Sequence, residues 1–256
     1  MPALLETKGI TMRFNGQAVL DGVSWQVEEG SFKSIIGPNG AGKTTFFNII
    51  SGQLKPSGGQ VLYRGRDITG EPTHVRAKMG IGRSFQITSV FPNLTVSENV
   101  RLAVQTATNL RLNFWQDYRK LGALQDQAHQ YLAMTRLHEK GSQLAKNLTL
   151  GEKRKLELAM LLALEPEVLL LDEPTAGMAL EEVPSMVEVI RNVHRQRKRT
   201  VLMVEHKIDL VLDLSDSIAV LFNGTLLADG PPAEIVRNGK VQAAYLGGLY
   251  EQYAQG

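Results

Sequence analysis

A glycine-rich stretch near the N-terminus constrains this chain more than any other feature. Residues 37–44 read Gly-Pro-Asn-Gly-Ala-Gly-Lys-Thr, which satisfies the spacing G-x-x-x-x-G-K-S/T. The strand-like segment Phe32–Ile36, in which apolar and polar residues loosely alternate, precedes it. Thr44–Ser51 has helical spacing and stops at Gly52, a suitable C-terminal cap. A strand, a glycine-rich loop and a helix in this order predict a loop whose backbone N–H groups converge on phosphate.

Each position of this loop has an expected role in binding ATP with Mg²⁺. Glycines let the backbone wrap the phosphates, and the following helix adds partial positive charge. Lys43 would bridge the β and γ phosphates, Thr44 would place its hydroxyl on Mg²⁺, and Thr45 could reach the α phosphate. A glycine-rich turn without a ligand is the alternative, but the spacing, the lysine and the context all favour a phosphate site. The wrapping residues are Gly37, Pro38, Asn39, Gly40, Ala41 and Gly42.

A second motif supplies carboxylates. Val168–Leu171 is a run of four apolar residues, typical of a buried strand, and Asp172 and Glu173 follow it directly. Ligands of open α/β sheets bind at such carboxyl ends. Asp172 is therefore predicted to hold Mg²⁺, and Glu173 to act as the general base that polarises the attacking water. Taken alone the run could be a solvated strand end; with the loop it predicts ATP hydrolysis.

The rest of the chain alternates between strand-like and helix-like segments. The first third reads as strands with turns at Asn15-Gly16 and Glu29-Gly30, whereas a stretch from about 95 to 164 shows helical spacing only. From Val168 onward, short apolar runs alternate with amphipathic segments, which predicts a parallel sheet. The expected strands elsewhere are Leu4–Ile10, Val19–Val27, Gln60–Tyr63, Thr200–Val204 and Ile218–Phe222.

The amino-acid composition excludes several classes of protein. With 43% hydrophobic and 21% charged residues over 256 positions the chain should fold, and a net charge of +2 argues against a nucleic-acid binder that works mainly by electrostatics. The absence of cysteine excludes disulfides and thiolate metal sites. The residues after Met1 lack the pattern of a secretory signal, and the longest apolar runs fall short of the about 20 residues that span a bilayer. Any membrane role is expected to come through a partner.

With both motifs in order, the chain resembles the ATP-binding subunit of ABC transporters over nearly its whole length. The resemblance implies an α/β P-loop NTPase fold: a RecA-like core with an N-terminal antiparallel β subdomain and a helical subdomain insert. We expect one nucleotide-binding domain over 1–256, with the core and β subdomain at about 1–94 and 165–256. The helical subdomain, which carries the signature segment, would span about 95–164.

Three further residues match positions of that family. Phe14 is similar to the aromatic residue that stacks on adenine, although a half-exposed aromatic in a hairpin is the alternative. Gln86 resembles the glutamine that senses the γ-phosphate and its Mg²⁺ and begins the segment facing the membrane subunit. His206, after the run Thr200–Val204, resembles the switch histidine that contacts the γ-phosphate and orders the catalytic Glu173. A structural histidine at a strand end is its alternative.

The signature segment departs from the usual Leu-Ser-Gly-Gly-Gln. It reads Leu148-Thr-Leu-Gly-Glu152, which keeps Leu148 and Gly151, and Thr149 keeps a hydroxyl able to donate to a γ-phosphate. These three residues are expected to meet the nucleotide of a second subunit, while Leu150 replaces a glycine. After Glu173 the family often has Ser-Ala-Leu-Asp, but here Ala179 stands where the aspartate would be. We expect weaker communication between the two sites of the dimer, or a partner subunit that supplies it.

The resemblance also implies partners, a location and a class of solute. ATP would lie between two subunits, self or paralogue, arranged head to tail on the cytoplasmic face of the inner membrane. They would be held there by permease subunits and served by a solute-binding protein. Residues 65–70, the insert with Phe114-Trp115 and the tail at 241–247 resemble importers of branched-chain amino acids or of urea and amides. The related lipopolysaccharide exporters are expected to have a shorter insert.

Two other classes remain as alternatives. A soluble ABC ATPase of DNA repair or translation would use nucleic acid, for which the basic run 195–199 is the one pointer in the sequence. Cations that suit the dipole at a helix C-terminus are the favoured explanation of this run. A regulatory protein with a decayed site is opposed by the complete set of Lys43, Thr44, Asp172, Glu173 and His206.

Overall fold

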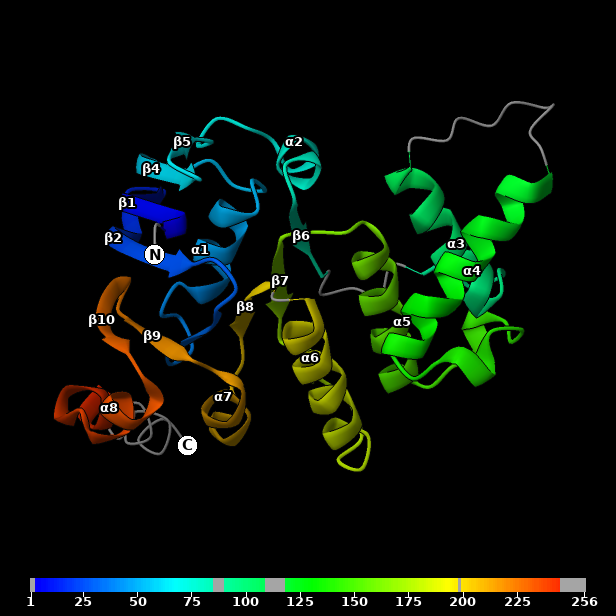
Figure 1. The fold of residues 1–256 in the computed structure, drawn as a ribbon. Helices are drawn as coiled ribbons and strands as arrows, with labels where there is room; N and C mark the ends of the chain where they lie inside the picture. The colour runs from blue at the N-terminus through cyan, green and yellow to red at the C-terminus, as the bar shows by residue number, and fades with distance from the viewer. Residues whose placement is uncertain (1–2, 85–89, 109–117, 198, 245–256) are drawn as a thin grey trace. The chain divides into compact units, whose positions relative to one another are not determined.

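The structure is a computed structural model that describes residues 3–84, 90–108, 118–197 and 199–244 (Figure 1). The chain divides into two compact units. The first comprises residues 1–81, 168–173 and 198–256, and the second comprises residues 82–167 and 174–197.

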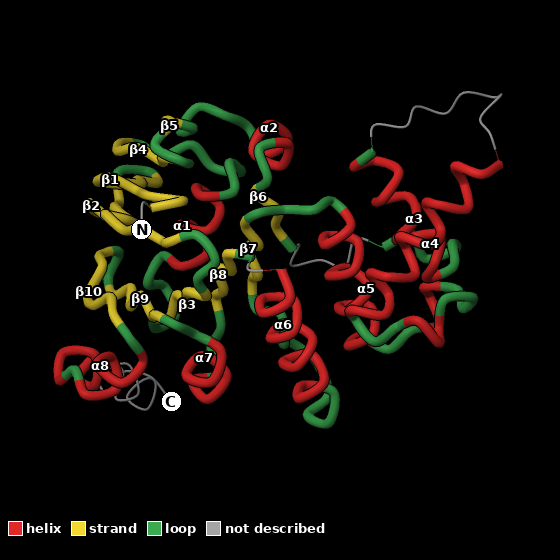
Figure 2. The backbone as a smooth tube through the Cα atoms, in the orientation of Figure 1, coloured by secondary structure: helices red, strands yellow, loops and turns green. Residues whose placement is uncertain are grey.

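The first unit begins with an antiparallel sheet. Among the described residues it has four strands in the order β2-β1-β4-β5 (Figure 2). A turn at Asn15-Gly16 joins the first two strands, and both turn residues have positive φ, 50° and 83°. This is the geometry that Asn-Gly favours in hairpins, which confirms the predicted turn. The strands are β1 (Ala3–Phe14), β2 (Gln17–Glu28), β4 (Gly58–Tyr63) and β5 (Arg66–Asp67).

A second sheet carries the core strands. Within the described residues its order is β10-β9-β3-β8-β7-β6. The strands β9, β3, β8 and β7 pair in parallel, as the alternating pattern predicts, whereas β10 pairs antiparallel with β9. Strands β3, β7 and β8 are buried at every position. The bounds are β3 (Phe32–Ile36), β6 (Ile81–Arg83), β7 (Val168–Asp172), β8 (Thr200–Val204), β9 (Ser217–Phe222) and β10 (Thr225–Gly230).

Helix α1 (Lys43–Ile50) follows the glycine-rich loop and is anchored in the core. Phe46 and Phe47 are fully buried, and the ring of Phe46 meets that of Trp25 edge to face with centroids 5.7 Å apart. Gly52 follows the C-cap with φ 79°, which confirms the predicted glycine cap. The other helices of this unit are α2 (Thr73–Lys78), α7 (Ile208–Leu214) and α8 (Pro232–Arg237).

A buried arginine also closes the end of α1. Arg76 is 1% exposed, and its Nη1 donates to the carbonyls of Ile49 and Ile50 at 2.8 and 2.7 Å. Its other nitrogens donate to the carbonyls of residues 68, 69 and 71. Burial lowers the pKa of Arg76 to about 10, opposed by nearby Glu71 and Asp67. The guanidinium thus satisfies carbonyls that the last helical turn leaves open.

The described residues of the second unit form helices and the loops between them, with strand at Gly82 and Arg83 of β6 and an isolated bridge between Thr95 and Leu144. Within the stretch with helical spacing, the apolar residues Leu124, Ala128, Leu132 and Leu137 are buried. Helices α3 and α5 each begin with a capping box, formed by Thr95 with Glu98 and by Thr149 with Glu152. The elements are α3 (Val96–Ala107), α4 (Tyr118–Met134), η1 (His138–Lys140), η2 (Ala145–Asn147), α5 (Leu150–Ala163) and α6 (Val183–Arg197).

Candidate nucleotide site

The glycine-rich loop leaves β3 at its carboxyl end, between two parallel neighbours. A Cβ added at Gly37 would lie 2.2 Å from the carbonyl oxygen of Leu221, and one at Gly42 would lie 2.7 Å from the Leu20 side chain. Gly42 also has φ 95°. Gly40 differs, because its φ of 79° favours glycine although no neighbour lies within 4 Å. The loop therefore needs glycine at two positions for space and at one for conformation alone.

The N-terminus of α1 is left open by its own sequence. Gly42 is its N-cap, no side chain caps it, and no acidic residue lies in the first turn. The first N–H groups of a helix have no intrahelical acceptor, and the aligned peptide dipoles place partial positive charge there. The end of α1 therefore suits a phosphate group.

Lys43 crosses the loop from the first turn of α1. Its Nζ donates to the carbonyl oxygens of Gly37 and Pro38 at 2.7 and 3.0 Å, and the residue is 6% exposed. Burial lowers the pKa of Lys43, while the charges of Glu173 and Asp172 act in the opposite sense. A buried ammonium thus lies within electrostatic reach of both carboxylates that the sequence singles out.

The two carboxylates follow one another at the end of β7. Asp172 is the last residue of the strand and is 2% exposed. Glu173 has φ 47°, a left-handed conformation that is unusual for a residue other than glycine, and its N–H still donates to the carbonyl of Val204 at 2.9 Å. This backbone turn places the side chain of Glu173 half-exposed at the sheet edge.

His206 meets Glu173 across the sheet edge. Its Nε2 lies 3.0 Å from Oε1 of Glu173, and the two side chains are 45% and 30% exposed. Strand β8 lies beside β7 in parallel, so the residues that follow the two strands emerge at the same edge. The structure thus brings together two residues that are separated by 33 positions in the sequence.

Glu205 supports this pair, and sequence reasoning did not single it out. It is 4% exposed, and its Oε2 accepts the backbone N–H groups of His206 and Lys207 at 2.8 and 3.3 Å. The carboxylate fixes the turn between β8 and α7, and with it the direction of the imidazole. An acidic residue directly after the apolar run 200–204 is the signal that could have revealed it.

The remaining predicted site residues are placed as follows. Phe14 ends β1 and is 43% exposed, and Thr44 and Thr45 lie in the first turn of α1. Gln86 lies outside the described residues. In the second unit, Thr149 is the N-cap of α5, with Gly151 in the first turn and Leu148 buried before it.

The comparisons with known proteins decide the family. The family profile described as "ABC transporter" matches residues 20–176. The chain belongs to the ABC transporter family. It is 39% identical to the "High-affinity branched-chain amino acid transport ATP-binding protein LivG" of Salmonella typhimurium over 251 residues, 95% of this chain and 98% of that protein. It is 38% identical, with the same coverage, to BraF of Pseudomonas aeruginosa.

Further comparisons agree with the branch and the fold. A profile described as "Branched-chain amino acid ATP-binding cassette transporter" matches residues 225–250. A crystal structure of an ATP-binding cassette of an ABC transporter in its ADP conformation matches with a TM-score of 0.82 and 28% identity, covering 96% of this chain and all of that one. The expected fold class and family are therefore confirmed: the protein is an ABC-type ATPase of the LivG/BraF type, a subunit of a transporter.

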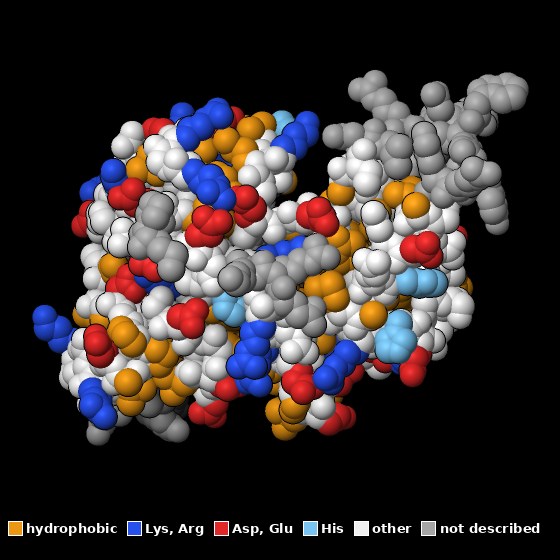
Figure 3. Space-filling model, viewed as in Figure 1, with side chains coloured by type: hydrophobic (Ala, Val, Ile, Leu, Met, Phe, Trp, Pro, Cys, Tyr) orange, Lys and Arg blue, Asp and Glu red, His pale blue; other side chains and the backbone are white. Residues whose placement is uncertain are grey.

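Two further observations concern the surface charge and the helices. Lysine and arginine side chains lie interspersed with aspartate and glutamate over the face shown in Figure 3, rather than in one stripe of like charge. In the part of the chain that the structure describes, no helix combines the length and apolar character needed to cross a bilayer.

Proposed function

We propose that this ABC ATPase powers uptake of branched-chain amino acids by hydrolysing ATP on the site built by the glycine-rich loop, Asp172, Glu173 and His206. The observation that carries the assignment of the chemistry is the 3.0 Å contact between Glu173 and His206 at the end of β7. The class of solute is supported by the similarity to LivG and BraF along nearly the full chain.

The loop residues bind and orient the triphosphate. The backbone N–H groups of the loop and the open end of α1 face the phosphates, and Lys43 supplies a positive charge. The Thr44 hydroxyl and the Asp172 carboxylate are hard oxygen donors of the kind that Mg²⁺ takes together with phosphate oxygens. When bound there, Mg²⁺ would neutralise charge on the β and γ phosphates.

Glu173 accepts a proton from the attacking water. A carboxylate within hydrogen-bond reach of the water acts as a general base. His206 holds Oε1 of that carboxylate, which fixes the direction in which Oε2 points, and Glu205 fixes the backbone of His206. His206 is therefore assigned a positioning role toward Glu173 in addition to its expected contact with the γ-phosphate.

The proposal extends to the partners. Two ATPase subunits close head to tail on ATP, so that Leu148, Thr149 and Gly151 of one meet the nucleotide held by the other. The subunit lies at the cytoplasmic face of the inner membrane through permease subunits, and a solute-binding protein delivers the solute. Closure moves the permease, and hydrolysis reopens the dimer.

Replacing the base tests the mechanism. Glu173→Gln keeps the shape of the side chain but cannot take a proton, so ATPase turnover should fall by at least about 100-fold. ATP binding, measured by calorimetry, should change less than about threefold, because the phosphate loop is untouched. Asp126→Asn removes an exposed carboxylate on α4 and serves as the control. Retention of most of the turnover by Glu173→Gln would refute the assignment.

A separate measurement tests the solute. The ATPase assembled with its permease in lipid discs should be stimulated by the solute-binding protein loaded with leucine, isoleucine or valine. Stimulation by urea or short amides instead would move the protein to the alternative importer class and leave the ATPase mechanism intact.

A further inference from the structure

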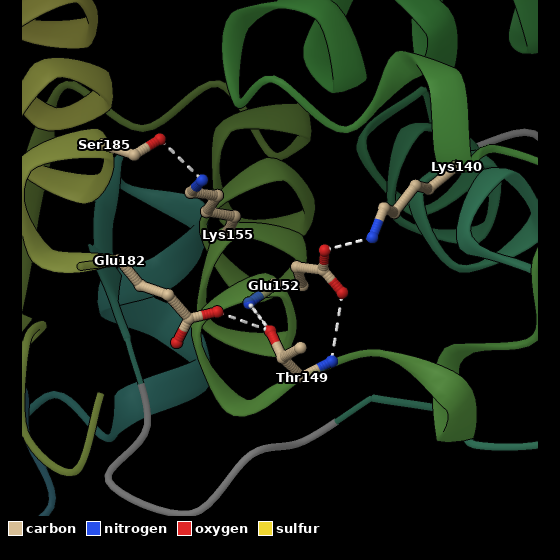
Figure 4. Close-up of polar contacts among 6 residues, drawn as sticks. All are labelled: Lys140, Thr149, Glu152, Lys155, Glu182 and Ser185. Atoms are coloured by element: carbon tan, nitrogen blue, oxygen red, sulfur yellow. Dashed lines mark hydrogen bonds and ion pairs between the residues drawn. The ribbon is translucent and has the colours of Figure 1, made fainter. Parts of the chain in front are cut away.

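The hydroxyl of Thr149 already has an acceptor within its own chain. Its Oγ1 donates to Oε1 of Glu182 at 2.7 Å, while the same Oγ1 accepts the backbone N–H of Glu152 at 3.2 Å (Figure 4). Glu152 in turn accepts the N–H of Thr149 at 3.0 Å. A hydroxyl has one hydrogen to donate, so in this conformation Thr149 has none left for a phosphate.

Gly151 makes room for the same carboxylate. A Cβ added there would lie 2.6 Å from the carboxyl carbon of Glu182. The glycine kept in the altered signature therefore leaves space that Glu182 fills. Close by, a Cβ on Gly177 would lie 3.2 Å from Leu150, the residue that replaces a family glycine. Leu150 thus lies against Gly177, two positions before Ala179, in the second unit.

The surroundings favour a negative group at this position. Glu182 lies at the N-terminal end of α5, a helix of 14 residues, where the helix dipole is positive. Lys140 forms an ion pair with Glu152, and Lys155 donates to the hydroxyl of Ser185 at 2.7 Å (Figure 4). Burial lowers the pKa of Lys155, and the charges of Glu152 and Glu182 oppose that shift.

We infer that Glu182 competes with the γ-phosphate held by the second subunit for the Thr149 hydroxyl and for the space beside Gly151. The inference rests on the proposed function, since it needs the signature segment to meet a nucleotide across a dimer. The carboxylate of Glu182 must leave Thr149 before the phosphate can accept a hydrogen bond from the Thr149 hydroxyl. The hydroxyl has one hydrogen to donate, and the two acceptors are both anions. Glu182 thereby sets the ATP concentration at which two subunits close.

The test measures closure directly. Self-association of the purified Glu173→Gln chain is followed by light scattering as ATP is added, with and without Glu182→Gln or Glu182→Ala. Removing the competing charge should lower the half-maximal ATP concentration by roughly fivefold, a typical size for coupling between sites. Glu181→Gln removes an adjacent, exposed carboxylate and should leave the midpoint unchanged.

Two controls separate the possible failures. ATP binding to the phosphate loop of the separate subunit, measured by calorimetry, should be equal in all variants, and urea unfolding shows that each is folded. If the parent chain binds ATP but never self-associates, the proposed dimer fails and the inference falls with it. If the parent chain closes but the Glu182 variants keep or raise its midpoint, the proposed function stands and the competition by Glu182 is refuted.

Discussion

The N-termini of α1 and α5 both lie at the positive end of a helix dipole, but their surroundings differ. Helix α1 begins at Gly42 with no side-chain cap and no acidic residue in its first turn. Helix α5 begins at Thr149 with a complete capping box, and the carboxylate of Glu182 lies beside it. The end of α1 is ready for an anion, whereas the end of α5 is already satisfied by its own chain. In the proposed dimer, the end of α5 would meet a phosphate only when the second subunit brings one.

Helix α3 shows which part of this difference is local. Its box of Thr95 and Glu98 has the same Thr-x-x-Glu pattern as that of Thr149 and Glu152. The hydroxyl of Thr95 donates to Oε2 of Glu98, within its own box, at 2.8 Å. The hydroxyl of Thr149 donates instead to Glu182, on another segment. The same Thr-x-x-Glu pattern therefore does not decide which carboxylate accepts the hydrogen bond from the threonine hydroxyl.

Within this comparison, the largest effect is expected from replacing the N-cap glycine of α1. Gly42→Ala places a Cβ 2.7 Å from Leu20 and forces a left-handed φ on alanine, so ATP affinity should fall by at least about tenfold with a stability loss of roughly 1–3 kcal/mol. Gly40→Ala meets no neighbour within 4 Å and pays only the conformational cost, about 1 kcal/mol. Calorimetric ATP titration and urea unfolding compare them. If Gly42→Ala and Gly40→Ala lost the same ATP affinity, the steric contact with Leu20 would not be the reason for glycine at position 42.

A smaller effect is expected from removing each threonine hydroxyl. Thr95→Val and Thr149→Val both delete an N-cap oxygen, and each should lower the free energy of unfolding by about 1 kcal/mol. Only Thr149→Val should also weaken ATP-driven closure, because only that hydroxyl faces the second subunit in the proposed dimer. Urea unfolding and light scattering measure the two quantities. Equal closure by both variants would place Thr149 among purely structural caps.

The smallest effect is expected from acid. Hydrogen bonds from the N–H and hydroxyl of Thr95 lower the pKa of Glu98 below its usual 4.5. A lowered pKa in the folded state contributes stability that is present above that usual value and is lost as the pH falls through the lowered pKa. The urea midpoint should therefore decline below a pH of about 4.5. In Glu98→Gln that decline should be shallower, and an unchanged slope would contradict the shift.

Several elements could be read from sequence because their signals are local. The bounds predicted for β3 and β8, Phe32–Ile36 and Thr200–Val204, are confirmed residue for residue, since apolar residues predominate in both of these short runs. Strand β10 was missed, because its residues are mostly half-buried and show no such run. Arg76 was missed as well, because its acceptors come from two other segments of the chain, residues 49–50 and 68–71.

By itself the sequence determined the features whose atoms lie within one turn or one strand: the glycine-rich loop, the uncapped start of α1 and the two Thr-x-x-Glu boxes. Such features depend on bonds between near neighbours, which spacing alone specifies. Only the tertiary structure decided that Glu173 meets His206 and that Thr149 meets Glu182, each pair being 33 residues apart. Those contacts depend on which strands pair and which helices pack, and thus on the burial of the whole core.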